Sequence, residues 1–569
     1  MQIMNFSEAN CRHCYKCVRT CKVKAIKIID DQAHIIPEKC IACGQCFASC
    51  PQNARNIHSD LDLVYNALKN GEKIVVSIAP SFRGFFKDSP KLITALKEIG
   101  FHKVEETAIG ADVVTELYKK EINTFGKKNY ITTCCPSVVS LIEKYFPTVI
   151  DNLMPFVSPM IAHGKILKEE NPGALTAFLG PCIAKKYEAL SKDNPESIDA
   201  VLTFDEVLLL LEKESIDYNT LSDSISDKGG SQFGTKYPLV GGILENISNE
   251  IEDAGLNYIR VDGIDECKEI FQEISKGNIQ NCCIEASACK KSCIGGPAGS
   301  TISDSTYTRL QNIKNFLKTE KSYTPPTDEI LEFDFAKASV SKHIDEIMPT
   351  QEQITEILRS LGKNEKADEL NCAGCGYETC RENAISIFQG MSHLDMCIHF
   401  VRRKAERVSN EIFENSPNAI LFLDKNLGVL ESNAAFSRYF GIAPAEIKEI
   451  GIGDLLDIPK LQNVMFTKQN ILWEKIYFPK YSLHMGISII YMENQDALMV
   501  ILKDVTEEVE RKEELKVLKE NTLKITQSVI EKQMRVAQEI ASLLGETTAE
   551  TKVALNKVKD VFREEGGDL

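Results

Sequence analysis

The chain has 569 residues, which is too long for one hydrophobic core and predicts roughly three to five domains. Its 66 Lys and Arg residues against 82 Asp and Glu residues give a formal net charge of −16, which disfavours nucleic acid as a partner. No stretch is long and apolar enough to span a bilayer, and the first residues lack an apolar signal region. We therefore expect no membrane association and a cytoplasmic location.

The chain contains 20 cysteines, and none of them follows residue 397. Disulfides are rare in reducing compartments, so this density of cysteines in a protein expected to be cytoplasmic predicts metal ligation. We expect metal chemistry up to residue 397 and a different role for the remaining residues.

Two matching cysteine runs stand before residue 51, each with the spacing C-x2-C-x2-C-x3-C. In such a pair, three thiolates of one run hold a 4Fe–4S cluster and the fourth reaches the other cluster. One cluster should be held by Cys11, Cys14, Cys17 and Cys50, and the other by Cys40, Cys43, Cys46 and Cys21. We therefore predict a two-cluster ferredoxin-like domain at 1–62, with zinc sites as the alternative. Lys22 stands where a proline usually follows the first run.

Short apolar runs begin to alternate with helical patterns near residue 65. Buried strands are expected at 74–79, 130–133 and 174–179, where apolar runs end at turns. Strands that alternate with helices predict an α/β sheet, and the carboxyl ends of such strands gather the ligand.

Chemically active residues follow the ends of these strands. Ser81, Cys135 and Cys182 come directly after them, so the topology should bring these three residues to one site. A further element at 282–296 adds Cys289 and Cys293 beside a glycine pair that permits close backbone approach.

Three loops resemble the signature loops of the FeFe-hydrogenases: TTCCP at 132–136, GPCIAKK at 180–186 and EASACKKSC at 285–293. They occur in the family's order behind two ferredoxin-type cysteine runs, and the resemblance covers about residues 1–310. It implies an α/β hydrogenase domain, which we place at 63–365. The implied reaction is the reversible oxidation of H2 and reduction of protons.

The resemblance also implies a cofactor, the H-cluster. In this family a 4Fe–4S cube is bridged by a cysteine to a two-iron unit that carries carbon monoxide, cyanide and an amine dithiolate. The bridging cysteine here would be Cys293. The cube would be held by Cys135, Cys182, Cys289 and Cys293.

The resemblance assigns roles to neighbouring side chains as well. Ser81 and Lys185 would donate hydrogen bonds to the cyanides, because a buried anionic ligand favours charge-assisted donors. Cys134 would pass protons to the bridging amine, and a small buried side chain without a role is the alternative reading. Lys186, next to Lys185, is expected to be a solvated surface charge.

Four residues depart from the family pattern. Gly180 and Ser287 stand where methionines usually pack against the two-iron unit, so the redox tuning of the site should differ. Tyr118 and Met154 stand where a carboxylate and a hydroxyl usually relay protons. Neither side chain passes protons readily near neutral pH.

Protons are therefore expected to reach Cys134 by another route. Glu285 lies in the third loop, and Glu245 follows a flexible glycine pair, so these two acids are the candidate relay groups. The alternatives are that Glu285 caps local backbone and that Glu245 is a solvated helix residue. Glu121, which matches one group of the usual relay, should then matter little.

A third set of four cysteines has the spacing C-x2-C-x4-C-x16-C and resembles a small iron–sulfur domain, which we place at 366–402. Four thiolates suit either a 4Fe–4S cluster, our prediction, or zinc. The cysteines of this set are Cys372, Cys375, Cys380 and Cys397.

The remaining residues resemble a signalling module. The segments at 415–424, 432–436 and 504–506 resemble the motifs of a PAS domain, an α+β fold that we place at 403–508. Residues 509–569 are expected to form a helical tail with coiled-coil character over about two heptads. No histidine follows His484, so the tail is not the phosphoacceptor helix of a histidine kinase and should act on a separate kinase or phosphatase. A homodimer is expected.

The sequence thus predicts a FeFe-hydrogenase of the sensory, PAS-containing branch, with H2 and protons as reactants and a redox partner such as ferredoxin. The alternative is a metabolic, ferredoxin-linked hydrogenase whose C-terminal part is a docking region. A relative that carries only 4Fe–4S cubes is disfavoured, because Ser81 and Lys185 would then have no cyanides to bind.

Overall fold

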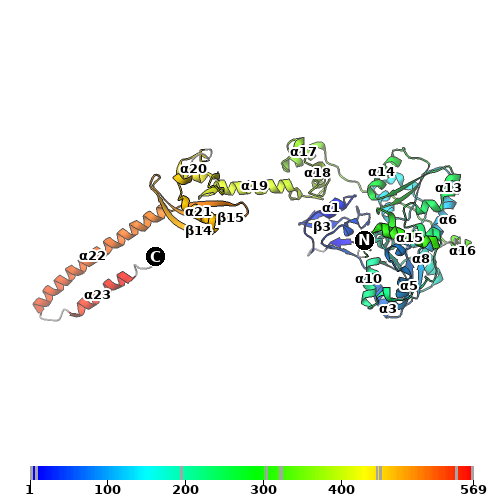
Figure 1. Ribbon diagram of the computed structural model, residues 1–569, viewed down its shortest axis with the longest axis horizontal. Coiled ribbons are helices and arrows are strands. Elements are labelled where there is room, and N and C mark those ends of the chain that lie inside the picture. The colour runs from blue at the N-terminus through cyan, green and yellow to red at the C-terminus, as the bar shows by residue number, and fades with distance from the viewer. Residues whose placement is uncertain are drawn as a thin grey trace. The chain divides into compact units, whose positions relative to one another are not determined.

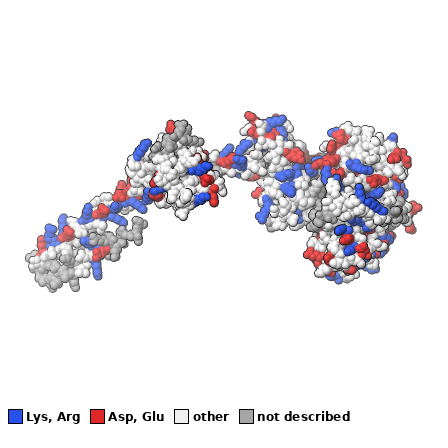
Figure 2. All heavy atoms as spheres, viewed as in Figure 1, with Lys and Arg blue, Asp and Glu red and all other residues white. Residues whose placement is uncertain are grey.

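A computed structural model describes residues 4–6, 10–191, 197–299, 302, 305–319, 325–443, 446–447, 452–544 and 549–564. The chain divides into two compact units, Met1–Val401 and Arg402–Leu569, which we describe separately (Figure 1). None of the helices in the described ranges combines the length and apolar composition needed to cross a bilayer. Acidic and basic side chains are interspersed over the visible face of the first unit (Figure 2).

The N-terminal part of the first unit is a small domain of strands and short helices. Its outer pair is antiparallel, β1 (Met4–Phe6) with β4 (Arg55–Ile57), and its hairpin joins β2 (Ile26–Ile29) to β3 (Gln32–Ile35). Two short helices carry cysteines of the two runs, α1 (Lys16–Thr20) with Cys17 and α2 (Gln45–Ala48) with Cys46. Both of these cysteines are buried, whereas Cys14 of the first run is exposed.

The central domain contains two parallel sheets rather than the single sheet that the strand pattern predicts. The first has the order β6-β5-β8-β9, and the second has the order β10-β11-β7. β5 is buried along its whole length, as expected for a strand covered on both faces. Their bounds are β5 Ile74–Ile78, β6 Lys103–Glu106, β7 Tyr130–Ile131, β8 Leu175–Gly180, β9 Ala200–Thr203, β10 Asn257–Asp262 and β11 Cys282–Ser287.

Helices connect and cover these strands. α6 and α8 pack so closely that a Cβ atom on Gly110 would lie 2.2 Å from the carbonyl oxygen of Pro159. The helices are α3 Leu61–Lys69, α4 Phe82–Phe85, α5 Ser89–Ile99, α6 Ala108–Phe125, α7 Pro136–Tyr145, α8 Pro159–Glu170, α9 Ile183–Ala189, α10 Phe204–Lys213, α11 Gln232–Lys236, α12 Gly242–Asn246, α13 Ser248–Asp253, α14 Ile264–Ser275, α15 Thr306–Thr319 and α16 Asp328–Leu331. Short 3-10 helices lie at Pro147–Asn152, Tyr218–Thr220 and Ser292–Gly295.

The third cysteine set lies in a small helical region. Its helices are α17 (Gln351–Ser360), α18 (Cys380–Phe388), a 3-10 turn at Leu394–Met396 and the start of α19 (Ile398–Asn415); a further 3-10 turn covers Lys366–Asp368. Ile354 and Leu358 of α17 pack with Ala384 of α18. α17, which precedes the boundary predicted at residue 366, therefore packs against a helix of the third cysteine set.

The second unit contains a five-stranded antiparallel sheet in the order β13-β12-β16-β15-β14. The sequence Asp-x-Thr at its end has a structural role: Thr506 receives a hydrogen bond from the backbone N–H of His484 at 2.9 Å. The elements are β12 Ala419–Leu423, β13 Val429–Ser432, α20 Ala434–Phe440, a 3-10 turn at Ile452–Asp454, α21 Ile458–Thr467, β14 Ile471–Phe478, β15 Leu483–Met492, β16 Ala497–Asp504, α22 Thr506–Leu544 and α23 Ala549–Glu564.

Candidate metal centre and active site

The carboxyl ends of the two parallel sheets face one cavity of about 110 Å³ in the central domain. β5 and β8 of the first sheet lead to Ser81 and Cys182. β7 and β11 of the second sheet lead to Cys135, Cys289 and Cys293. All five residues line the cavity, so the structure brings together the strand ends that the sequence analysis singled out.

Local backbone geometry presents the cysteines at this cavity. Cys135 and Cys182 each occupy the position directly before a helix, α7 and α9 respectively. The glycine pair after Cys293 is needed because a Cβ atom on Gly296 would lie 2.6 Å from the carbonyl oxygen of Pro181. A Cβ atom on Gly295 would meet the carbonyl oxygen of Lys290 at 2.0 Å. Only glycine therefore lets the third loop close against the second.

The four thiols in the cavity fit a positively charged iron–sulfur group. Burial and then neighbouring cysteines raise the pKa of Cys182 to about 11, and burial also raises the pKa of Cys293 to about 12. Burial likewise raises the pKa of Cys289 well above its ordinary value. Four thiolates that line one cavity would repel one another, and bound iron would offset that repulsion.

Ser81 and Lys185 supply polar groups to the cavity wall. The Ser81 Oγ atom is buried and has no hydrogen-bond partner among the described residues, so it is available to a bound group. The Lys185 ammonium lines the same cavity and donates to Glu188 and Ser158, each at 2.7 Å. Buried donors of this kind fit anionic ligands on a metal group.

Cys134 also lines the cavity, and its thiol is held by its neighbours. Its Sγ atom lies 3.5 Å from the hydroxyl of Tyr118, which in turn accepts a hydrogen bond from the Thr133 backbone N–H at 2.9 Å. Burial raises the pKa of Cys134 to about 12, so the thiol keeps its proton at neutral pH. Burial also raises the pKa of Tyr118 well above 10, so this phenol stays neutral.

The three acids considered for proton transfer occupy different environments. Glu285 is buried and accepts hydrogen bonds from the backbone N–H groups of three residues, at 2.6 Å from Gly241, 3.0 Å from Ile243 and 3.2 Å from Leu244. It therefore caps α12, the alternative role considered for it. Burial nevertheless raises the pKa of Glu285 to about 7.

Glu245 and Glu121 lie away from the cavity wall. The Glu245 side chain is 51% exposed and lies 3.7 Å from the Lys236 ammonium, which matches the alternative considered for it, a solvated helix residue. Glu245 nonetheless lies on α12, the helix that Glu285 caps. Glu121 is buried but paired at 3.0 Å with Lys128.

Lys186 and Gly180 lie in surroundings that the sequence alone does not show. Lys186 is not a surface charge: it is fully buried, donates to the carbonyl oxygen of Val201 and lies 3.0 Å from Glu206. Gly180 faces the ring of Phe178, which would lie 2.7 Å from an added Cβ atom and itself lines the cavity. The aromatic ring therefore occupies space beside the position where the family pattern has a methionine.

A row of buried polar side chains lies beside the cavity, and no motif in the sequence predicts it. Thr107 lines the cavity, and its Oγ1 atom lies 2.7 Å from the Ser77 hydroxyl. Ser77 contacts Nδ1 of His163 at 2.9 Å, and Nε2 of His163 lies 3.5 Å from Glu105. These residues come from β5, β6, α8 and the start of α6, so only the fold brings them together.

One of the two predicted groups of N-terminal cysteines lies around a single cavity. The cysteines expected to hold the second cluster line one small cavity, and they include Cys21 from the first run: Cys21, Cys40, Cys43 and Cys46. In the first group, Cys11 and Cys14 lie close enough to Cys17 to act on its pKa, which burial raises. In the third set, burial raises the pKa of Cys375, and Cys397 and Cys372 raise it further.

Glu285 generates a testable pH dependence. Its pKa in the fold, about 7, lies above the ordinary value of 4.5, so its contribution to stability is complete below pH 4.5 and is lost as pH rises to 7. Between pH 4.5 and 7 the free energy of unfolding of the wild type should fall, relative to that of Glu285→Gln, by up to about 1.4 kcal/mol per pH unit. Urea unfolding of both proteins from pH 5 to 8 measures this difference in stability. The same pH dependence of stability in both proteins would contradict the prediction. Glu245→Gln, a substitution at an exposed acid, should behave as the wild type.

The chain matches three family models. Residues 72–297 match the iron only hydrogenase large subunit, C-terminal domain, and residues 3–58 match a 4Fe-4S dicluster domain. Residues 368–399 match an Fe–S cluster family.

Individual proteins resemble parts of the chain. Iron hydrogenase 1 from Clostridium pasteurianum is 28% identical over 324 residues, which cover 48% of this chain and 56% of that protein. Cytosolic iron-sulfur assembly component 3 from Bos taurus is 26% identical over 262 residues, which cover 38% of this chain and 55% of that protein. A solved variant of [FeFe]-hydrogenase HydA1 from Chlamydomonas reinhardtii aligns over 50% of this chain and 100% of its own, with 15% identity and a TM-score of 0.40.

The chain thus spans about half the length of the curated relatives it matches. The family models cover the two-sheet domain with its cysteine-lined cavity and the small domain that holds the paired cysteine runs. The central part of this chain is thus similar to the C-terminal domain of the iron-only hydrogenase large subunit, and the segment before it is similar to a 4Fe–4S dicluster domain.

Proposed function

We propose that this protein carries out reversible H2 oxidation and proton reduction at an H-cluster in the central cavity. The observation that carries the proposal is the meeting of four thiols with two further groups, the Cys134 thiol and the unpartnered Ser81 hydroxyl, in one cavity. A domain that held only a cube would need the four thiols alone. The other two groups suit a second, two-iron part of the cofactor.

The cavity residues divide into ligands, donors and a proton carrier. The bound H-cluster would supply the redox chemistry, held by Cys135, Cys182, Cys289 and Cys293. Ser81 would donate to its anionic ligands, and the Lys185 ammonium, fixed by Glu188, would place a positive charge beside them. Cys134 would hold a proton at Sγ, because its high pKa keeps it protonated and Tyr118 fixes its position.

Protons would reach Cys134 from the α12 side of the cavity. Glu285 is the candidate placed closer to Cys134. Burial is the main cause of the raised pKa of Cys134, and the negative charge of Glu285 raises it further. Its own pKa of about 7 suits both accepting and releasing a proton near neutral pH. Glu245 would serve at the exposed end of the route, where solvent protons are captured.

We propose a sensory role for this chemistry, with the second unit as a PAS domain and a signalling tail. Two features support it: the five-stranded antiparallel sheet with its closing Asp-x-Thr contact, and the long α22 that follows directly. The altered wall at Gly180 and Phe178 agrees with a site tuned differently from that of a high-turnover enzyme. In the rival proposal, a metabolic hydrogenase, the second unit is a docking region for a redox protein.

A role in iron–sulfur assembly is the second candidate function, favoured by the likeness to cytosolic iron-sulfur assembly component 3. It requires the cubes but no proton donor in the central cavity. The Cys134 thiol therefore distinguishes the two functions.

Replacing Cys134 tests the proposed activity. In protein matured with its two-iron unit, Cys134→Ala should lower hydrogen evolution by about 100-fold or more, because a positioned proton donor is lost. Iron content should stay at the wild-type level, since Cys134 is not one of the expected ligands. Hydrogen evolution assays with iron analysis measure both, and undiminished activity would return Cys134 to the class of buried side chains without a role.

Three glutamate variants test the proton route. Glu285→Gln should lower hydrogen evolution by about 10-fold or more, because it keeps the size of the side chain but removes the exchangeable proton. Glu245→Gln should have a smaller effect, since water can replace an exposed group, and Glu121→Gln should have none. Loss of activity in Glu121→Gln, with Glu285→Gln active, would show that protons use the family's usual route.

A further inference from the structure

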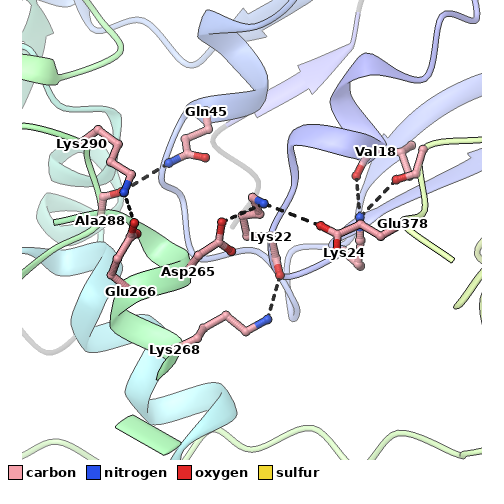
Figure 3. Close-up of polar contacts among 11 residues, drawn as sticks. Val18, Lys22, Lys24, Gln45, Asp265, Glu266, Lys268, Ala288, Lys290 and Glu378 are labelled. Carbon is pink, nitrogen blue, oxygen red and sulfur yellow. Dashed lines mark hydrogen bonds and ion pairs between the residues drawn. The ribbon is translucent and has the colours of Figure 1, made fainter. Parts of the chain in front are cut away.

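Lys22, the residue that replaces the usual proline after the first cysteine run, joins three parts of the first unit. Its ammonium lies 2.8 Å from Asp265 on α14 of the central domain and 3.9 Å from Glu378 beside the third cysteine set (Figure 3). Its carbonyl oxygen accepts a hydrogen bond from Lys268 at 3.2 Å. The departure at Lys22 therefore has a structural purpose that a proline would not serve.

Two neighbouring cations tie the third cysteine set to the same segment. Lys24 donates to the carbonyl oxygen of Val18 at 3.3 Å and to that of Gly376 at 3.1 Å, and so bridges the two regions (Figure 3). Arg19 donates to the carbonyl oxygen of Ala373 at 3.3 Å. We call Arg19, Lys22 and Lys24 the basic joint.

The joint brings two cysteine regions into direct contact. Gly376 has a φ of +94° and would place an added Cβ atom 2.9 Å from Val18, so only glycine allows this approach. Tyr377 packs in one apolar cluster with cysteines of both regions, Cys17 and Cys21 from the first run and Cys375 from the third set. The third site thus adjoins a segment whose two cysteines are expected to serve different clusters.

The second cluster site contacts residues that adjoin the central cavity. Gln45 of α2 donates to the carbonyl oxygen of Ala288, the neighbour of Cys289, at 3.3 Å. Lys144, at the end of the helix that Cys135 begins, donates to the carbonyl oxygen of Cys40 at 2.7 Å. A continuous row of cluster sites therefore runs from the central cavity through the dicluster domain to the third site.

We propose that the third four-cysteine site is the end point of electron transfer, held against the dicluster domain by the basic joint, and that its reduction places negative charge at the start of α19. This inference rests on the proposed function as the source of electrons. One electron would leave a reduced N-terminal cluster, which returns to its oxidised level, and would reduce the third cluster by one electron. No bond is made or broken in this step.

The position of Cys397 supports an effect of this added charge on α19. The carbonyl oxygen of Cys397 accepts a hydrogen bond from the Val401 backbone N–H at 3.0 Å, so this cysteine begins the helix. Reduction would add negative charge at the N-terminal end of α19, where the helix dipole favours it. The redox state of the third site would thereby act directly on the helix that leads into the second unit.

Magnetic coupling between clusters tests the proposal without hydrogen. We would reconstitute the full chain with 4Fe–4S clusters, reduce it with dithionite and record low-temperature electron paramagnetic resonance spectra. The wild type should show a spin–spin splitting that Cys375→Ser/Cys380→Ser, which lacks the third cluster, has lost. Lys24→Met should lose the splitting with its iron content unchanged, whereas Lys16→Met, which removes an exposed lysine from the same helix as Arg19, should keep it.

Arg19→Met is the second variant, because its side chain is exposed and its loss should not affect cluster binding. If Lys24→Met loses iron, loss of the splitting in Arg19→Met at full iron content supports the proposal. A wild-type spectrum equal to the sum of isolated clusters would overturn it, as would a retained splitting in both joint variants or zinc at the third site. Each of these failures would leave the hydrogen chemistry standing, since no step of the test uses it.

Discussion

The crowding of thiols at the meeting point of two parallel sheets is the constraint on which the rest of the central domain depends. Cys135, Cys182, Cys289 and Cys293 share one small cavity, and burial raises the pKa values of the last three. Such a cluster of desolvated thiols is costly unless metal neutralises it, so cofactor binding and folding are coupled. The glycine pair, the two helix starts and the fixed Lys185 ammonium all serve to hold that cavity in shape.

Local spacing predicted much of this arrangement, and long-range packing accounts for what it missed. The doubled cysteine run correctly placed Cys21 with the second group, because ligand spacing is a short-range property. The positions of Ser81 and Cys182 after the ends of strands could also be predicted from the sequence. The division into two sheets was not, since strand pairing depends on contacts far apart in sequence. The burial of Lys186 was missed for the same reason, because it follows from a partner on another element.

The departures from the family pattern acquire physical meaning in the fold. Gly180 leaves room for the Phe178 ring at the cavity wall, and Lys22 binds acids of two neighbouring regions. Tyr118, which replaces a relay acid, holds the Cys134 thiol in place with a hydroxyl that stays neutral. In our account Tyr118 removes the usual proton route and Gly180 alters the redox tuning. Lys22 helps to hold the third cysteine set, which begins α19, against the dicluster domain.

Infrared spectroscopy of protein matured with its two-iron unit tests the central claim most directly. Carbon monoxide and cyanide have stretching bands in a region where protein groups do not absorb, and no other part of this chain would carry them. The account predicts these bands in the wild type, and it predicts that Ser81→Ala shifts a cyanide band while keeping the number of bands. Protein with its full complement of cubes but without any carbon monoxide or cyanide band after maturation would contradict the account.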